Sequence, residues 1–169
     1  MFVLWRLYNA ILIGCVVLAG TLIGAGILLV VVDVSMRALG FQPFGFTVAF
    51  VEYVLLYFVL LAAPYLVREK GHVTAEVLFT QLGPKSKRIC EKIVYCLCIA
   101  VSLVFAYEGG LLFDEALRYG YVDERSVDVP YWALYVLFPI CFTMIAIEFT
   151  RYLLGFDSMY VRDAAPESM

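Results

Sequence analysis

The chain has 169 residues, of which 64% are hydrophobic and 16% are charged, and its mean hydropathy is +0.92. Soluble domains average about 45–50% apolar residues, and a core built from 169 residues cannot absorb the excess, so a membrane is the natural solvent. The formal net charge of −3 excludes a broad basic surface for nucleic acid.

The first apolar run predicts a membrane-spanning helix over residues 7–32. A helix of that length rises about 39 Å, enough to cross a hydrocarbon core of about 30 Å with some tilt. A signal peptide is the rival interpretation, but its apolar region is only about 7–15 residues long, and no small-residue cleavage site ends this run. Asp33 and Arg37 end it instead. Gly20 and Gly24 form a GxxxG pattern, which predicts close packing against another helix.

A second span is predicted over residues 46–67, after a turn region that contains glycine and proline. Pro64 removes one backbone hydrogen bond from this helix and is expected to kink its last turn. The charged residues that follow, beginning with Arg68, end the span.

Glu52 is the most informative residue of the second span because it places a carboxylate inside an apolar segment. A charged side chain there costs roughly 2.5–3.5 kcal/mol on insertion scales, so it should face protein or water and not lipid. Three interpretations remain open. Glu52 carries a coupling proton, or it makes a structural contact with Arg37 or a partner chain, or it is a protonated packing residue.

Residues 73–82 are too short to cross the membrane. Their apolar side chains recur at the spacing of one helix face. These side chains are Ala75, Leu78, Phe79 and Leu82. The spacing predicts a short amphipathic helix that lies in the plane of the membrane interface. An ordinary structured loop is the alternative.

Two further spans are predicted over residues 89–113 and 130–154, with the polar stretch 114–128 between them. Asp128 is placed to cap the start of the last span. Pro130 falls in the first turn of that span, where a missing N–H costs little.

Further along the last span, Pro139 is expected to kink the helix. Glu148 and Arg151 are three residues apart, so an ion pair near the inner surface is expected. The polar tail 156–169 is expected to be loose, which leaves residues 1–155 as a single membrane domain.

Basic residues are divided unequally between the two sides of these spans. One side, with both termini and the 68–88 loop, has Arg6, Arg68, Lys70, Lys85, Lys87, Arg88, Lys92, Arg151 and Arg162. The other side has Arg37, Arg118 and Arg125. The positive-inside rule places the richer side in the cytoplasm and the acidic 114–128 loop outside. The predicted fold is an all-α integral membrane protein with four transmembrane helices and one short interfacial helix.

No sequence pattern indicates a catalytic, cofactor or metal site. The five cysteines lie in or beside apolar runs, and Cys96 and Cys98 lack the two-residue gap of a redox pair, so all five are interpreted as reduced packing residues. His72 is the only histidine and cannot build a metal site alone. The sequence has no glycine-rich phosphate loop and no Gly-x-Ser-x-Gly elbow. We therefore expect a protein that is not an enzyme and holds no cofactor.

Several motifs, taken in order, resemble one known family. The most specific is Arg68-Glu69-Lys70-Gly71-His72-Val73. The others are Asp33-Val34-Ser35-Met36-Arg37, Glu52, Pro84, Arg88, Pro130-Tyr131-Trp132 and Phe138-Pro139-Ile140. Over nearly the whole chain they resemble the small permease (Q-type) subunit of tripartite ATP-independent periplasmic (TRAP) transporters. Family members often have an acid two residues past the His-Val pair, where this chain has Ala75, followed by Glu76.

The resemblance implies a four-span subunit of the bacterial inner membrane that associates with a much larger permease subunit. The large subunit holds the sodium and substrate sites and moves as an elevator, and the small subunit extends its stationary scaffold. A periplasmic substrate-binding protein delivers the substrate, commonly an organic acid, and an ion gradient drives uptake.

On this interpretation several residues become candidates for structural or partner contacts. They are Asp33, Arg37, Glu52, Arg68, Gly71 and His72. Arg68 and His72 would lie at the cytoplasmic headgroup level, where they could bind lipid phosphate or loops of the partner.

Two rival functions come from other classes. A self-sufficient proton-coupled transporter would use Glu52, but the mid-membrane stretches have few polar side chains and no convincing inverted repeat. A membrane anchor of a redox complex would need axial histidines inside spans if it held haem, whereas His72 lies in a loop. An anchor that binds only quinone has no positive signal in the sequence.

Overall fold

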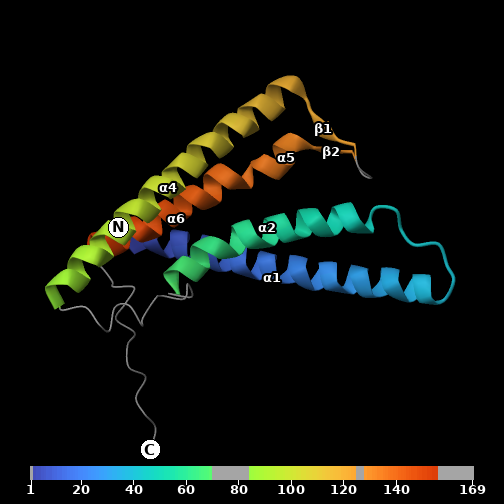
Figure 1. Cartoon of the computed structure of the whole chain (residues 1–169), viewed down its shortest axis with the longest axis horizontal. Coiled ribbons are helices and arrows are strands. Elements are labelled where there is room, and N and C mark those ends of the chain that lie inside the picture. Colours follow the sequence, from blue (N-terminus) through green and yellow to red (C-terminus); the bar gives the residue numbers. More distant parts are fainter. Residues whose placement is uncertain (1, 70–83, 125–127, 156–169) are drawn as a thin grey trace, which may run out of the picture.

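The computed structural model describes residues 2–69, 84–124 and 128–155. These residues form helices and one very short β-hairpin (Figure 1). The elements are α1 (Phe2–Ala38), α2 (Thr47–Arg68), α4 (Pro84–Tyr119), β1 (Val122–Asp123), β2 (Val129–Pro130), α5 (Tyr131–Tyr135) and α6 (Leu137–Leu153). The predicted interfacial helix over 73–82 lies outside the described residues.

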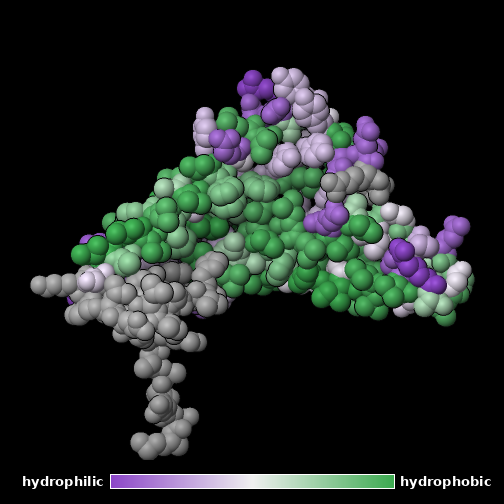
Figure 2. All heavy atoms as spheres, in the orientation of Figure 1, coloured by the Kyte–Doolittle hydropathy of each residue, from purple (hydrophilic) through white to green (hydrophobic). Residues whose placement is uncertain are grey.

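Four helical stretches in the described chain are long and apolar enough to cross a membrane. They are Trp5–Ala38, Thr47–Arg68, Arg88–Tyr119 and Tyr131–Leu153. This finding confirms the predicted all-α membrane fold with four spans. Figure 2 shows hydrophobic residues over the middle of the visible face and hydrophilic residues gathered at the far ends of the two helical hairpins.

Two helices run well beyond their predicted spans. α1 contains 37 residues and α4 contains 36, so each rises about 55 Å, far more than the roughly 30 Å of a hydrocarbon core. Hydropathy marks only the lipid-facing part of such a helix, whereas helical hydrogen bonding continues into the polar zone. Asp33 and Arg37 therefore lie inside α1, and the first residues of the 114–128 stretch are the last turns of α4.

The four long elements form two antiparallel hairpins, α1 with α2 and α4 with α5–α6 (Figure 1). α2 and α6 lie in the middle and pack against each other, while α1 and α4 lie on the outside. The start of α1 and the end of α6 lie at the same end of the molecule, here called the terminal end. From there, α1 and α4 diverge toward the opposite end.

Two clusters of buried side chains hold the hairpins together. The cluster near the terminal end contains Val67, Tyr95, Phe149 and Tyr152, and it joins α2, α4 and α6. The second cluster contains Ala19, Leu60, Leu61 and Cys141, and it joins α1, α2 and α6. All the described cysteines are unpaired, and Cys141 is fully buried in this second cluster.

The last span consists of α5 and α6 with Val136 between them. Val136 keeps helical dihedral angles (φ −56°, ψ −34°), and its N–H bonds the Trp132 carbonyl at 3.0 Å. Pro139 has no N–H for the carbonyl of Tyr135, four residues earlier, and the kink expected from it stays a prediction. The predicted cap by Asp128 is wrong. Pro130 occupies the position before the first turn, without a side-chain cap, and the Tyr131 N–H bonds the Tyr121 carbonyl across the β-hairpin at 3.0 Å.

Gly109 allows a close approach of α4 to α6. A Cβ added there would lie 2.6 Å from the Cβ of Phe138, whereas one added at Gly110 would meet nothing within 4 Å. The Phe138 Cβ is attached to the backbone and cannot swing away, so the helices would have to separate.

Gly109→Ala should therefore lower the free energy of unfolding by about 1–3 kcal/mol, the usual cost of overpacking. Gly110→Ala is the matched control and should be neutral or stabilising by up to about 1 kcal/mol, because alanine favours helix. Unfolding in mixed detergent micelles measures both variants. Equal stability of the two would contradict the tight crossing.

Candidate functional site

Asp33 is a buried structural anchor at the end of α1. Its side chain accepts hydrogen bonds from the Arg37 Nε at 2.8 Å, the Thr47 hydroxyl at 3.0 Å and the Phe44 N–H at 3.2 Å. Asp33 is only 4% exposed. These bonds join the end of α1 to the start of α2, so the structure brings the two predicted candidates Asp33 and Arg37 together as an ion pair.

Glu52 lies on an exposed face of α2. Exposed apolar side chains share that face at helical spacing: Val48, Leu55, Val59 and Leu66. Glu52 itself is exposed, and it lies near the start of a helix that can span the membrane. Arg37, one of the partners considered for it, forms an ion pair with Asp33. The result is an apolar membrane-level surface with one carboxylate in it, here called the Glu52 face.

An apolar groove runs beside the Glu52 face, between α1 and α2. Its volume is about 220 Å³. Its lining residues are Ile23, Gly26, Ile27, Val30, Val31, Val51, Val54 and Leu55. Leu55 belongs to both the groove and the Glu52 face. Gly26 allows the close approach of the helices here, because a Cβ on it would lie 3.1 Å from the Val54 Cγ1.

The two glycines of the GxxxG pattern are not used in this way within the described chain. A Cβ added at Gly20 or Gly24 would meet nothing within 4 Å. Whether the pattern packs against a helix of another chain stays a prediction.

Two tyrosines of α2 tie it to the second hairpin, and sequence analysis did not single them out. The Tyr53 hydroxyl lies 2.9 Å from the Asp123 carboxylate, and the Tyr57 hydroxyl donates to the Ala133 carbonyl at 2.5 Å. Their sequence signal was only that of aromatic residues in an apolar run. The partners lie 70 and 76 positions away in the chain, so no local pattern could reveal these contacts.

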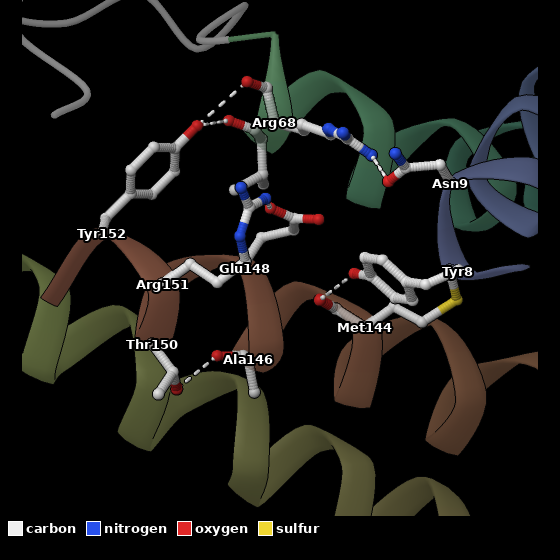
Figure 3. Close-up of polar contacts among 10 residues, drawn as sticks. Tyr8, Asn9, Arg68, Met144, Ala146, Glu148, Thr150, Arg151 and Tyr152 are labelled. Carbon is white, nitrogen blue, oxygen red and sulfur yellow. Dashed lines mark hydrogen bonds and ion pairs between the residues drawn. The ribbon is translucent and has the colours of Figure 1, made fainter. Parts of the chain in front are cut away.

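At the terminal end, polar side chains from α1, α2 and α6 form a second site, here called the terminal cluster (Figure 3). The Arg68 Nη1 donates to the Asn9 Oδ1 at 2.6 Å. The guanidinium carbons of Arg68 and Arg151 lie 5.2 and 4.1 Å from the centre of the Trp5 ring. Both cations thus share one aromatic side chain, an arrangement worth roughly 0.5–2 kcal/mol for each cation.

Glu148 is the buried acid of the terminal cluster. Its Oε2 lies 2.5 Å from the Arg151 Nη1, which confirms the predicted ion pair. Burial was not predicted: Glu148 is 0% exposed, and its Oε1 has no hydrogen-bond partner among the described residues. The sequence signal that could have revealed this is its place inside the apolar run from Met144 to Phe149.

Tyr152 covers the end of α2. Its hydroxyl lies 3.0 Å from the Val67 carbonyl and 2.9 Å from the Arg68 carbonyl (Figure 3). The last carbonyls of a helix have no partner within the helix, so the single hydroxyl hydrogen, shared between these two carbonyls, supplies a donor where α2 meets α6. Gly71 and His72, the remaining predicted candidates, lie outside the described residues, and their roles stay predictions.

The charged side chains of the described residues make contacts between helix ends. Within residues 2–69, 84–124 and 128–155, no three His, Cys, Asp or Glu side chains lie close enough together to hold a metal ion. The charged groups instead tie helix ends together, at Asp33 and at Glu148. Two surfaces of the described residues are candidates for an interaction: the Glu52 face with its groove, and the terminal cluster.

Comparison with known proteins gives one family. The family described as "Tripartite ATP-independent periplasmic transporters, DctQ component" matches residues 26–156. The match extends from the middle of α1 to the residue after the described chain ends. No curated protein and no solved structure matches the chain significantly.

Proposed function

Because the chain belongs to the DctQ family of TRAP transporter components, we propose that it is the stationary scaffold on which the large permease subunit of such a transporter is held. The family and the four apolar spans make the chain a multi-pass membrane component of a TRAP transporter, and that family is not a class of enzymes. The scaffold role, the ion coupling and the partner surface are the proposed part.

The observation that carries the proposal is the Glu52 face. An exposed carboxylate among apolar side chains at membrane level is costly against lipid, by roughly 2.5–3.5 kcal/mol. A partner helix along this face would cover its exposed apolar side chains and shield the Glu52 carboxylate from lipid. We therefore place the large permease subunit along α2, over Glu52 and the adjoining groove of α1 and α2.

The rest of the fold supports a static role. Tyrosine hydrogen bonds tie α2 to α5 and α6, and the terminal cluster ties α1 to α6. The two described core clusters are made of apolar and aromatic side chains, which offer little to bind a solute. In the proposed complex the large subunit carries the sodium and substrate sites, and a periplasmic substrate-binding protein delivers the substrate.

We propose that the terminal end lies in the cytoplasm, in the bacterial inner membrane. Arg68 and Arg151 lie at that end, whereas the acids Asp114 and Asp123 lie near the opposite end of the second hairpin. This distribution agrees with the positive-inside rule. Labelling single cysteines added at each end, in intact cells, tests the orientation. Labelling of the Arg68 end from outside would reverse it.

The test of the scaffold role is capture of the full chain from its native membranes in mild detergent, followed by mass spectrometry. We expect a large multi-pass permease at close to one copy per chain. Recovery of this chain alone, as a stable oligomer that transports solute in liposomes, would instead support the self-sufficient transporter.

Glu52→Gln should weaken assembly with the large subunit about tenfold. A tenfold loss of affinity corresponds to about 1.4 kcal/mol, close to the lower end of the roughly 1.5–3 kcal/mol that a hydrogen bond to a charged group contributes. Glu108→Gln is the matched control, since Glu108 is also an exposed carboxylate on a spanning helix but belongs to α4. The yield of large subunit that co-purifies measures both. Intact assembly and intact uptake with Gln at position 52 would exclude the contact. Intact assembly with lost uptake would point to proton coupling at Glu52.

A further inference from the structure

Arg68 is a half-buried cation without an anion among the residues that the structure describes. Its Nη1 donates to the neutral amide of Asn9, and its guanidinium lies near the Trp5 ring. Among the described residues, the ion pair at this end joins Arg151 and Glu148. A guanidinium has five N–H donors in a fork suited to phosphate, so the Arg68 side chain has donors left for a ligand.

Arg151 adds a second guanidinium beside the same Trp5 ring. Its side chain is 25% exposed, and its charge is balanced by the fully buried Glu148. Counting these three groups, Arg68 and Arg151 against Glu148, the terminal cluster has an excess of one positive charge. The cluster therefore attracts an anion, and it does so at a place that side chains of three helices have fixed.

The helix ends at this site do not cancel the attraction. The C-terminus of a helix carries a partial negative charge on its unpaired carbonyls. The Tyr152 hydroxyl lies on the Val67 and Arg68 carbonyls at the end of α2, and the Glu69 and Leu154 N–H groups bond the carbonyls of Tyr65 and Thr150. With these carbonyls hydrogen-bonded, the end of α2 keeps the positive charge of the Arg68 guanidinium, next to which Glu69 is an exposed acid.

The position of the cluster identifies the source of the anion. Arg68 is the last residue of the span in α2, and Trp5 is the first residue of the span in α1. Tryptophan and arginine at such helix ends lie at the level of the lipid headgroups. Next to them, α1 exposes apolar side chains such as Leu7 and Ile11, along which acyl chains can lie.

We propose that Arg68, with Arg151 and Trp5, binds the phosphodiester of an anionic phospholipid in the leaflet at the terminal end. The Arg68 guanidinium donates hydrogen bonds to the phosphate oxygens, Arg151 adds positive charge, and the Trp5 ring holds both cations in place. This site is separate from the Glu52 face, and it requires of the proposed function only that the chain crosses a bilayer.

Native mass spectrometry of the purified full chain, titrated with phosphatidylglycerol, tests the site. Arg68→Gln should weaken lipid binding about tenfold or more, because a hydrogen bond to a charged group contributes about 1.5–3 kcal/mol. Arg68→Lys keeps the charge and should bind with intermediate affinity. Arg118→Gln is the matched control at the far end of α4, where an exposed arginine pairs with Asp114, and it should bind like the unaltered chain.

Two measurements on the unaltered chain do not depend on the folding of any variant. Phosphatidylglycerol should bind at least about fivefold more tightly than phosphatidylcholine, and the preference should shrink in high salt, which screens charge. Millimolar inorganic phosphate should leave the lipid bound. Equal affinity for the two lipids, or displacement of phosphatidylglycerol by inorganic phosphate, would overturn the proposal, as would equal loss in the Arg68→Gln and Arg118→Gln variants. Co-purification of the large subunit is measured separately, so failure here leaves the scaffold proposal standing.

Discussion

Glu148→Ala should destabilise the folded chain by about 3 kcal/mol, the lower end of the loss expected when one partner of a buried ion pair is removed. The substitution leaves the Arg151 guanidinium, which is mostly buried, without its carboxylate. It also opens space at the junction of α1, α2 and α6. We expect the lower end of that range because the Arg151 side chain can turn toward the membrane surface and reach water once its partner is gone. Denaturation of the purified chain in mixed micelles, followed by circular dichroism, measures the loss.

Asp114→Ala is the matched control for Glu148. Asp114 also pairs with an arginine on its own helix, at 2.8 Å from the Arg118 Nε, but both side chains are exposed. Exposed pairs contribute at most about 1 kcal/mol. If the Glu148 and Asp114 variants lose the same stability, burial of the Glu148 pair is not what holds the terminal end together.

Asp33→Ala should cost about 2–4 kcal/mol and loosen the connection between α1 and α2. The carboxylate accepts hydrogen bonds from Arg37, Phe44 and Thr47. Hydrogen bonds to charged groups contribute about 1.5–3 kcal/mol each, and the total loss is smaller than their sum because the freed donors can bind water. The Phe44 amide should exchange its hydrogen much faster in the variant, which hydrogen-exchange mass spectrometry of residues 39–46 detects.

A double-mutant cycle separates this contact from a general loss of stability. Thr47→Val removes the hydroxyl that bonds the Asp33 Oδ1 at 3.0 Å. Residues in contact show coupling energies of about 0.5–3 kcal/mol. Additive effects of the Asp33 and Thr47 substitutions, together with unchanged exchange at Phe44, would contradict the anchor.

The spans were predictable because each needs only length and apolar composition, which the sequence states directly. The paired charges were partly predictable. The spacing of Glu148 and Arg151 indicated their ion pair, but the packing around it involves other helices, as where the Arg151 guanidinium lies over the Trp5 ring of α1. The spacing of two residues predicts whether they meet on one helix, but it does not predict which other helices pack against them.

The glycines show the same limit. GxxxG drew attention to Gly20 and Gly24, whereas close helix contacts within the described chain occur at Gly26 and Gly109. Which glycine faces a neighbour depends on the rotation of each helix about its own axis, and tertiary packing sets that rotation.

The β-hairpin was missed for a local reason. Its strands are two residues each, pairing Val122 with Pro130 and Asp123 with Val129, too short to show any alternation of apolar and polar residues. The hairpin also sets where α5 begins, which is why a cap by Asp128 was the wrong expectation. Glu52 was recognised from its hydropathy alone, but its place on an exposed apolar face required the structure.

The divergence of α1 from α4 has a mechanical consequence for the bilayer (Figure 1). The chain is narrow where the helices meet at the terminal end and broad at the other end, so it displaces less lipid from one leaflet than from the other. An unpaired wedge of this kind bends the surrounding membrane and stores elastic energy there. A neighbour that is broad where this chain is narrow would restore equal areas in the two leaflets, and the relief of curvature would then favour association even without one specific contact.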